Sequence, residues 1–505
     1  MAIAVVLLTV TLPPSVPVHL PSGSGSGLDA LAPDSSSLPQ GTRSVRLERP
    51  ATDVAVPLNV TVSQEPGLAV IGGPPNTLWV NVTGGMPPYT IQYLGLPGCP
   101  SGNTTVLVCA ATTAGWANTK VAVRDSEGAT NDSGNATFYV APSGTVSGTL
   151  QLGGAMGAVP DTFWGANLNF YSGSGYDSSS LASLVNATPI RWLRLPLAGT
   201  WVVDQRTTDW SQLAAFCAWT DCRSLMTLGG PGYNGSAIET AVATLENQDG
   251  VHPTYFSYGN EPNLWNNTGN STGPTGYALD VQNFTEEVRS VDPSARILGV
   301  EISGKPGAGA AYIEDTVRVN GANLSGVGIQ AYPQAAGAFN LFDFLAGLEA
   351  NNSVTASVAS VRSEVESVCP SCNLPILLDE FNGGSAPQYN AFRNGEPSVP
   401  FFAASIVQAF RANVSQFLPW TLASLPAYQC SFGMVVLVGS CDGRSLTPVY
   451  YLYSQLLDGF SSGELENASV VGASSTYSIA DSAAGTLRVL MANTNVSVGA
   501  KVALG

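Results

Sequence analysis

The sequence predicts a multidomain protein in which a (β/α)8 barrel of the TIM type follows an N-terminal β-sandwich and precedes a small C-terminal β-domain. Its 505 residues are too many for one ordinary domain. In the central part of the chain, short apolar runs alternate with amphipathic helical stretches, which is the pattern of βαβ units. On both sides, short alternating runs are separated by Gly, Pro, Asn and Asp, as in antiparallel sheets.

Composition divides the chain into four segments: 1–45, 46–143, 144–455 and 456–505. The first begins with the apolar run Met1–Leu12, which is too short to span a bilayer and has the length of a signal-peptide core. No Lys or Arg precedes this run. Residues 13–45 are rich in Pro, Ser and Gly and cannot bury a core, so we expect a flexible linker there.

Segment 46–143 is expected to form a β-sandwich because its strand-like runs are short and evenly spaced. These runs are Leu58–Val62, Leu78–Val82, Thr90–Tyr93, Val106–Cys109, Lys120–Arg124 and Thr137–Val140. The sequences GGMPPYTIQY, CPSGNTTVLVC and VAVRDSEG resemble the PKD-like immunoglobulin domains of exported microbial proteins. The resemblance implies an immunoglobulin-like spacer, with carbohydrate or surface binding as the alternative role.

Segment 144–455 carries eight candidate strands, the number that a TIM barrel needs. They are Phe163–Leu168, Ile190–Leu195, Ser224–Leu228, Tyr255–Gly259, Arg296–Val300, Gly326–Gln330, Ile376–Leu378 and Phe417–Pro419. Helical stretches between them are Ser236–Glu246, Val281–Val291, Ala311–Val319, Val354–Val368 and Pro400–Asn413.

The last segment returns to the alternation of a sheet. Its expected strands are Ala468–Val471, Tyr477–Ala480, Leu487–Ala492 and Ala500–Leu504. We expect them to form part of a small β-domain on the barrel, with a further strand from residues 145–158.

Charge excludes two classes of partner. Lys and Arg number 19 against 36 Asp and Glu, so the net charge is −17. Nucleic acid and anionic membrane surfaces should repel such a chain, and neither is expected as a partner. No segment has the roughly 18 uninterrupted apolar residues of a membrane helix, so no transmembrane anchor is expected. We expect a monomer.

Cofactor chemistry lacks its usual sequence features. We find no glycine-rich phosphate loop and no Ser-His-Asp arrangement, which argues against kinase and serine-hydrolase functions. The chain has only two histidines, His19 and His252. Cys369-Pro-Ser-Cys372 has no second CxxC beside it, so a disulfide is favoured over a zinc or redox site. We expect no cofactor and no metal.

Cysteines and asparagines both indicate export. The eight cysteines fall into neighbouring pairs, which favours local disulfides made in an oxidising compartment. The pairs are Cys99 with Cys109, Cys217 with Cys222, Cys369 with Cys372, and Cys430 with Cys441. Of the 31 asparagines, 15 begin an N-x-S/T sequon, more than chance would place there, which suggests an N-glycosylated surface. We therefore expect a secreted or cell-surface protein.

Two glutamates end candidate strands of the barrel. The fourth strand runs into Asn260-Glu261-Pro262, and the seventh runs into Asp379-Glu380-Phe381. Catalytic groups of TIM barrels sit at the C-terminal ends of the strands. Cleavage of a glycosidic bond needs one carboxylic acid to protonate the leaving oxygen and one carboxylate to attack the anomeric carbon or activate water.

The sequences GNEPNLW and LDEFNGG resemble clan A glycoside hydrolases, and the order of motifs extends this resemblance over about 160–460. Their surroundings resemble the heparanase and bacterial β-glucuronidase family or the β-xylosidase and iduronidase family. The resemblance implies that Glu261 is the acid/base and Glu380 the nucleophile, and their separation of 380 − 261 = 119 residues suits the clan.

Other clan positions carry over one at a time. Arg194 matches an Arg beside the nucleophile that keeps it ionised, and Asn260 matches the Asn that binds the sugar 2-hydroxyl. Tyr332 matches a Tyr that hydrogen-bonds the nucleophile, whereas Gln330 stands where the clan has His, which leaves the substrate pocket open. Trp420 matches the aromatic platform beneath the cleaved sugar.

Further aromatic candidates for sugar binding are Trp265 and Trp164. Asp379 precedes the nucleophile directly, and strand alternation predicts that the two side chains point to opposite faces. Asp379 is therefore interpreted as structural.

The sequence thus predicts a secreted retaining glycoside hydrolase that cleaves β-linked poly- or oligosaccharides. We expect the two carboxyl groups to lie about 5–5.5 Å apart, with Glu380 ionised at the working pH and Glu261 protonated. Two alternatives stay open: a surface or adhesion glycoprotein that binds glycans without cleaving them, and a transglycosylase that uses the same residues. The sugar, and endo or exo action, cannot be inferred from the sequence.

Overall fold

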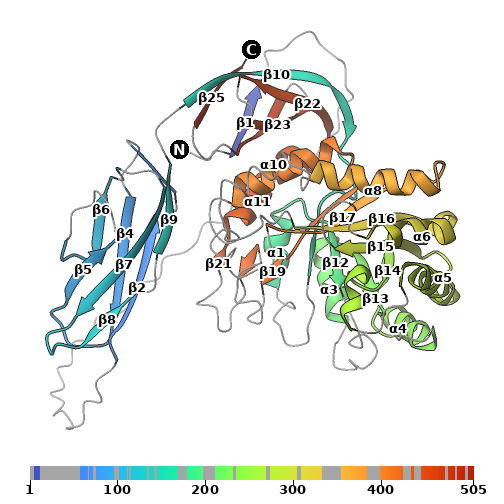
Figure 1. Cartoon of the computed structure of the whole chain (residues 1–505), viewed down its shortest axis with the longest axis horizontal. Coiled ribbons are helices and arrows are strands. Elements are labelled where there is room, and N and C mark those ends of the chain that lie inside the picture. The colour runs from blue at the N-terminus through green and yellow to red at the C-terminus, as the bar shows by residue number, and fades with distance from the viewer. Residues whose placement is uncertain are drawn as a thin grey trace, which may run out of the picture.

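The computed structural model contains a central barrel ringed by helices, a curved sheet beside it, and a separate pair of smaller sheets nearer the N-terminus (Figure 1). It describes residues 5–11 and 57–504 except 66–67, 72–75, 96–101, 111, 113–114, 134–135, 142–144, 169–178, 197–210, 231–234, 269–272, 304–306, 308, 333–353, 384–397, 425–433, 437–444, 473–475, 484–485 and 495–498. The expected linker at 13–45 lies outside these residues.

All eight expected barrel strands are confirmed, and they form one parallel sheet in chain order. The strands are β11 (Gly165–Asn167), β12 (Trp192–Pro196), β13 (Arg223–Leu228), β14 (Tyr255–Tyr258), β15 (Arg296–Ser303), β16 (Leu324–Ala331), β17 (Ile376–Phe381) and β18 (Gln416–Pro419). The barrel closes where Trp164 bridges Phe417, and the Phe417 amide donates to the Phe163 carbonyl at 2.7 Å.

The barrel interior begins with an apolar layer. Six strands each contribute one residue to a buried cluster, which is how inward-facing side chains of a TIM barrel pack. The residues are Trp192, Leu225, Tyr255, Leu298, Leu377 and Leu418. Strands buried on both faces read as continuous apolar runs, which explains why the sequence located them.

Helices surround the barrel and pack their apolar faces on its outer side, within the main hydrophobic core. The five expected helices are confirmed as α4 (Gly235–Asn247), α5 (Gly273–Val291), α6 (Ala310–Asn320), α8 (Val354–Val368) and α10 (Ser398–Arg411). The sequence did not predict α1 (Ser179–Asn186), α3 (Ser211–Thr220) or α11 (Pro448–Phe460). None of the described helices combines the length and apolar character that crossing a membrane would require.

The C-terminal strands build a six-stranded sheet in the order β1-β24-β23-β22-β10-β25. Their bounds are β1 (Val5–Thr11), β10 (Thr145–Ala158), β22 (Glu464–Val471), β23 (Thr476–Ala483), β24 (Thr486–Asn493) and β25 (Gly499–Leu504). The expected strand from 145–158 is confirmed, since β10 pairs with both β22 and β25. The apolar run for which the sequence suggested a signal-peptide core forms strand β1, which pairs with β24.

This sheet is attached to the barrel through α10, which lies between them (Figure 1). Arg411, in the last turn of α10, donates from Nη2 to the carbonyl oxygens of Ala468 at 2.7 Å and Ser478 at 3.1 Å. The guanidinium therefore links the helix to β22 and β23.

The N-terminal strands form two sheets that share one core. One sheet has the order β2-β4-β6, and the other β3-β9-β7-β5 with β8 paired to β7. The bounds are β2 (Asn59–Glu65), β3 (Leu68–Val70), β4 (Asn76–Thr83), β5 (Thr90–Leu94), β6 (Val106–Cys109), β7 (Gly115–Arg124), β8 (Thr130–Asp132) and β9 (Ala136–Ala141). The short strands β3 and β8 were not predicted.

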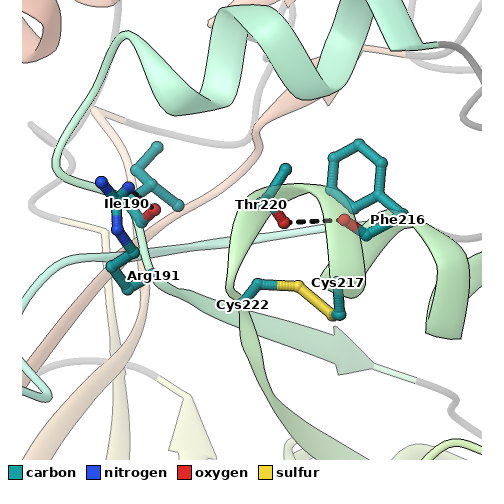
Figure 2. The surroundings of a disulfide bond; sticks show 6 residues. All are labelled: Ile190, Arg191, Phe216, Cys217, Thr220 and Cys222. Atoms are coloured by element: carbon teal, nitrogen blue, oxygen red, sulfur yellow. Dashed lines mark hydrogen bonds between the residues drawn. A yellow bond between two sulfur atoms is a disulfide. The ribbon is translucent and has the colours of Figure 1, made fainter.

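Two of the four expected disulfides are present. Cys217 at the end of α3 bonds to Cys222 just before β13, as Figure 2 shows, and Cys369 bonds to Cys372 after α8. Cys99, Cys430, Cys441 and the side chain of Cys109 lie outside the described residues. Their pairing stays a prediction that peptide mapping without reduction can test.

Close strand packing in the barrel predicts that Gly165→Ala is destabilising. A Cβ at Gly165 would lie 2.7 Å from the Trp192 carbonyl oxygen and would also meet the Leu418 side chain. We expect a loss of about 1–3 kcal/mol in the free energy of unfolding, measured in urea. Gly154→Ala on β10 is the matched control, because its Cβ would meet nothing within 4 Å. Equal stabilities of the two variants would contradict the close packing.

Candidate active site

A polar layer lies above the apolar layer of the barrel. On four strands, the residue two positions after the one in the apolar layer contributes to the polar layer, because alternate residues of a strand share a face. They are Arg194, Thr227, Ser257 and Asp379, and Glu301 of β15 joins them. All five side chains are fully buried. A buried charge is costly unless it is paired, so this layer needs internal compensation.

Arg194 is the centre of the layer. Its Nη1 donates to Asn167 Oδ1 at 2.7 Å and to Glu380 Oε2 at 3.1 Å, and its Nη2 donates to Asn260 Oδ1 at 2.6 Å and Glu301 Oε2 at 2.7 Å. Its Nε lies 3.3 Å from Glu301 Oε1. The guanidinium therefore joins the ends of five different strands, and it lies beside Glu380 as the sequence predicted.

Glu301 is a member of the site that the sequence analysis missed. Its carboxylate accepts hydrogen bonds from Arg194, from Thr227 Oγ1 at 3.1 Å and from Ser257 Oγ at 2.7 Å. A bulge in β15 between Leu298 and Glu301 turns this side chain inward. A lone Glu in the apolar sequence Val300-Glu301-Ile302 was the only available signal.

The expectation that Asp379 points away from Glu380 is wrong. The register of β17 against β16 shifts between Leu378 and Glu380, so Asp379 is an extra residue in a bulge and alternation is broken. Its Oδ2 lies 3.5 Å from Arg194 Nε, and within the described part of the chain neither carboxylate oxygen has a hydrogen-bond partner. Burial, and then the charge of Glu301, raise the pKa of Asp379 well above its ordinary value. Burial of Asp379 beneath Glu380 therefore favours its protonated form.

Glu380 lies at the opening of the barrel and retains 8% exposure. The Tyr332 hydroxyl donates to its Oε1, and Arg194 donates to its Oε2. Burial raises the pKa of Glu380 to about 7, although Arg194 and the Tyr332 hydroxyl both lower it. The expected neighbours of Glu380 are thus present, and its carboxyl group ionises near neutral pH.

Glu261 follows the end of β14 in a left-handed backbone conformation, with φ of 52°. Such conformations are uncommon outside glycine and need support from their surroundings. The Glu261 amide donates to the Glu301 carbonyl at 3.1 Å, and the Trp265 indole donates to the Asn260 carbonyl at 2.9 Å. Trp265 also packs against Gly259, where φ is 69°. Trp265 therefore holds the turn that presents Glu261.

Trp420 and Trp164, the other two tryptophans proposed for sugar binding, differ in accessibility. Trp420 follows β18 and is half-buried, with its amide donating to the Phe381 carbonyl at 2.8 Å and its carbonyl accepting from the Asn382 side chain. Trp164 is only 3% exposed, its indole donates to Phe460, and its ring packs on Phe163. Trp164 is thus a core residue and offers no face to a ligand, contrary to its candidacy as a sugar-binding residue.

Asn260 and Gln330 connect the two glutamates. Asn260 Oδ1 lies 2.6 Å from both Arg194 Nη2 and the Gln330 amide. Gln330, in turn, lies 2.9 Å from Glu261 Oε1. Among the described residues, no group of three or more His, Cys, Asp or Glu side chains is arranged to hold a metal ion.

Comparison with known proteins establishes the fold alone. No protein-family model matches the chain, and no curated protein matches it by sequence. A family 51 α-L-arabinofuranosidase from Bifidobacterium longum matches with a TM-score of 0.54 at 12% identity, over 71% of this chain and 88% of that chain. The GH51 arabinofuranosidase from Xanthomonas axonopodis pv. citri matches over the same shares, with a TM-score of 0.52 at 14% identity.

The raised pKa of Glu380 predicts a measurable dependence of stability on pH. Between about 4.5 and 7 the folded protein retains a proton that the unfolded chain has released, so stability falls as pH rises through this window. Glu380→Gln removes that dependence, which amounts to roughly 2–3 kcal/mol. Urea unfolding at the two ends of the window measures it, with the exposed Glu464→Gln as control. An unchanged dependence in Glu380→Gln would refute the assignment.

Proposed function

We propose that this protein is a secreted retaining glycoside hydrolase that acts on oligo- or polysaccharides. The observation that carries the proposal is that Glu380, at the end of the seventh barrel strand, is held by Arg194 and Tyr332, while Glu261 ends the fourth strand and is linked to the same Arg194. Glycosidic bond cleavage by double displacement requires two carboxyl groups of this kind.

The reaction follows from their two environments. The ionised Glu380 attacks the anomeric carbon and forms a glycosyl ester, while Glu261 gives its proton to the departing oxygen. Water then attacks the anomeric carbon while it gives a proton to Glu261, and the bond from that carbon to the Glu380 oxygen breaks, which releases the sugar with Glu380 ionised and Glu261 protonated again. Loss of the negative charge on Glu380 in the intermediate favours ionised Glu261, because two neighbouring carboxylates repel each other.

Two further residues fit the sugar that such a site would bind. Asn260 accepts from Arg194 and Gln330 through its oxygen, which leaves its amide nitrogen to donate to a sugar hydroxyl near the anomeric carbon. Trp420 can provide an aromatic platform at the end of β18. Trp265 would support the turn that carries Glu261 and would not contact the sugar itself.

The compared structures and the disulfides support this proposal without specifying the sugar. The solved structures with this fold include arabinofuranosidases. Disulfides and numerous sequons are typical of a protein that is exported through an oxidising compartment. The resemblance of the motifs to β-glucuronidases and β-xylosidases makes those glycosides further candidates.

A substrate screen of the purified chain tests the proposed function. Aryl β-glucuronides, β-xylosides, β-glucosides and α-L-arabinofuranosides, together with plant polysaccharides, should reveal turnover of at least one class. Turnover should disappear in Glu380→Gln. Glycan binding without turnover would instead support a non-catalytic adhesion protein, and transfer to added sugars in preference to water would identify a transglycosylase.

The division of roles predicts different rescue products in two variants. Glu380→Ala should abolish turnover, and azide should restore it by attack from the opposite face, giving a glycosyl azide of inverted configuration. Glu261→Ala should lower kcat/KM by about 10²–10⁴ for poor leaving groups. Azide should then give retained configuration, since the covalent intermediate still forms. Product configurations determined by NMR decide this, and the reverse products would mean that the roles are exchanged.

The nucleophile sets the acid limb of the pH profile in this proposal. Because the pKa of Glu380 is about 7, kcat/KM should fall about tenfold per pH unit below that value. Tyr332→Phe removes a hydrogen bond that lowers the pKa of Glu380, so its acid limb should move to higher pH. Initial rates at low substrate concentration between pH 4 and 9 measure both. An acid limb that Tyr332→Phe leaves in place would exclude Glu380 as its origin.

A further inference from the structure

The amide of Gln330 lies between the two ends of the proposed catalytic machinery. Gln330 is 1% exposed at the end of β16, so protein groups and not bulk water must satisfy its amide. One end of the amide lies 2.6 Å from Asn260 Oδ1 and 3.1 Å from Arg194 Nη2. The other end lies 2.9 Å from Glu261 Oε1.

The partners of Asn260 decide which way the Gln330 amide points when Glu261 is protonated. A guanidinium only donates, so Asn260 Oδ1 is an acceptor where it meets Arg194 Nη2 at 2.6 Å. The Gln330 atom at 2.6 Å from the same oxygen is then the amide nitrogen. Its carbonyl oxygen faces Glu261 Oε1 at 2.9 Å, and two acceptors this close form a hydrogen bond only if Glu261 holds a proton.

Ionised Glu261 requires the opposite orientation. A carboxylate only accepts, so the amide must turn by half a revolution and donate to Glu261. The Gln330 oxygen then lies 3.1 Å from Arg194 Nη2, where it can accept, but also against Asn260 Oδ1, which must turn or withdraw. Asn260 therefore favours the orientation that receives a proton from Glu261, whereas Arg194, which only donates, favours the reversed orientation.

We propose that Gln330 is a positioning residue that holds the proton of Glu261 in the free enzyme and reverses its amide when Glu261 ionises. The inference rests on the proposed function, and it explains why an amide can occupy this place. One side chain offers both a donor and an acceptor, so it serves both states of the acid/base. The charged and titratable groups facing this pair are Arg194, Tyr332, Glu301 and Glu380.

Gln330→Met keeps the shape of the side chain and removes both hydrogen bonds. For aryl glycosides with poor leaving groups, kcat/KM should fall about 10–100-fold, whereas activated leaving groups that need no proton should change less than about threefold. The basic limb of the pH profile should move to lower pH. Gln330→His should restore much of the loss, because a neutral imidazole also donates with one nitrogen and accepts with the other.

Equal losses for both classes of leaving group, or an unmoved basic limb, would overturn the inference. Failure of the proposed function would look different, because the wild-type chain would then cleave none of the glycosides. Infrared difference spectra still test the amide in that case. The carbonyl band that Glu261→Gln identifies should disappear at lower pH in Gln330→Met than in the wild type, and an unchanged pH would refute the role of Gln330.

An independent observation concerns the outer face of the sheet β2-β4-β6. Along β4, Leu78 and Val80 are buried, whereas Trp79 is 38% exposed and Asn81 and Thr83 are exposed on the opposite face. Exposed apolar area next to Trp79 continues onto β6, where Val106 is 44% and Val108 is 54% exposed. Asn81-Val82-Thr83 is an N-x-T sequon.

Strand geometry brings the sequon and the indole together. Trp79 and Asn81 are two residues apart on one face, which separates them by about 7 Å, a distance that a sugar ring on the Asn81 amide can span. The CH groups of a pyranose ring are apolar and suit the electron-rich face of an indole. We infer that Asn81 carries an N-linked glycan whose first sugar packs on Trp79 and shields it from water.

A second sequon on the same face provides the matched control. Asn59-Val60-Thr61 on β2 runs antiparallel to β4, with Asn59 opposite Thr83 and Thr61 opposite Asn81. Two residues before Asn59 the chain has Pro57, which offers no aromatic face. A glycan on Asn59 is thus exposed to the same solvent without the indole contact.

The full chain, secreted by a host with N-linked glycosylation, tests this inference. Glycopeptide mass spectrometry should find Asn81 occupied. Asn81→Gln should lower the Tm of the sandwich by roughly 2–4 °C in the wild type and by less than about 1 °C in Trp79→Ala, whereas Asn59→Gln should act equally in both backgrounds. An unmodified Asn81, or an equal Tm loss from Asn81→Gln in both backgrounds, would overturn it.

Discussion

The buried guanidinium of Arg194 is the interaction on which the rest of the site depends. Desolvating it would be costly if it stood alone, because isolated charges in a barrel interior lose their hydration. Oxygens from four other strand ends surround it, and each of its nitrogens faces at least one of them. The strand ends are thereby fixed relative to one another. The barrel, and not the surface loops, therefore sets the geometry of the proposed catalytic pair.

Charge balance around Arg194 determines which carboxyl groups can ionise. One positive charge faces Glu301, Asp379 and Glu380, so full ionisation would leave two uncompensated negative charges in a buried layer. Glu301 accepts hydrogen bonds from Thr227 and Ser257 in addition to Arg194. Asp379 has no hydrogen-bond partner among the described residues, and burial raises its pKa well above its ordinary value. Burial raises the pKa of Glu380 to about 7, against the opposing effects of Arg194 and the Tyr332 hydroxyl.

The eight strands and five of the helices of the barrel could be predicted because each is a separate apolar run with turn residues at both ends. Arg194, Asn260, Tyr332 and both glutamates were found through a motif resemblance, and the structure brings Arg194 and Tyr332 onto Glu380. The inward position of Glu301 and the orientation of Asp379 were not predicted, because strand alternation assumes a regular strand. The apolar run at the N-terminus suits a signal core as well as an edge strand, and in the structure residues Val5–Thr11 pair with β24.

The two bulges explain why the site could not be derived from strand periodicity. Each adds one residue near the carboxyl end of a strand, in β15 before Glu301 and in β17 at Asp379. Without the second bulge, Asp379 and Glu380 could not both face Arg194. With it, Asp379 lies deeper, toward the apolar layer, and Glu380 lies at the opening beside the Tyr332 hydroxyl. Burial raises the pKa of both carboxyl groups, and of the two only the shallower Glu380 keeps an exposed fraction through which a substrate could reach it.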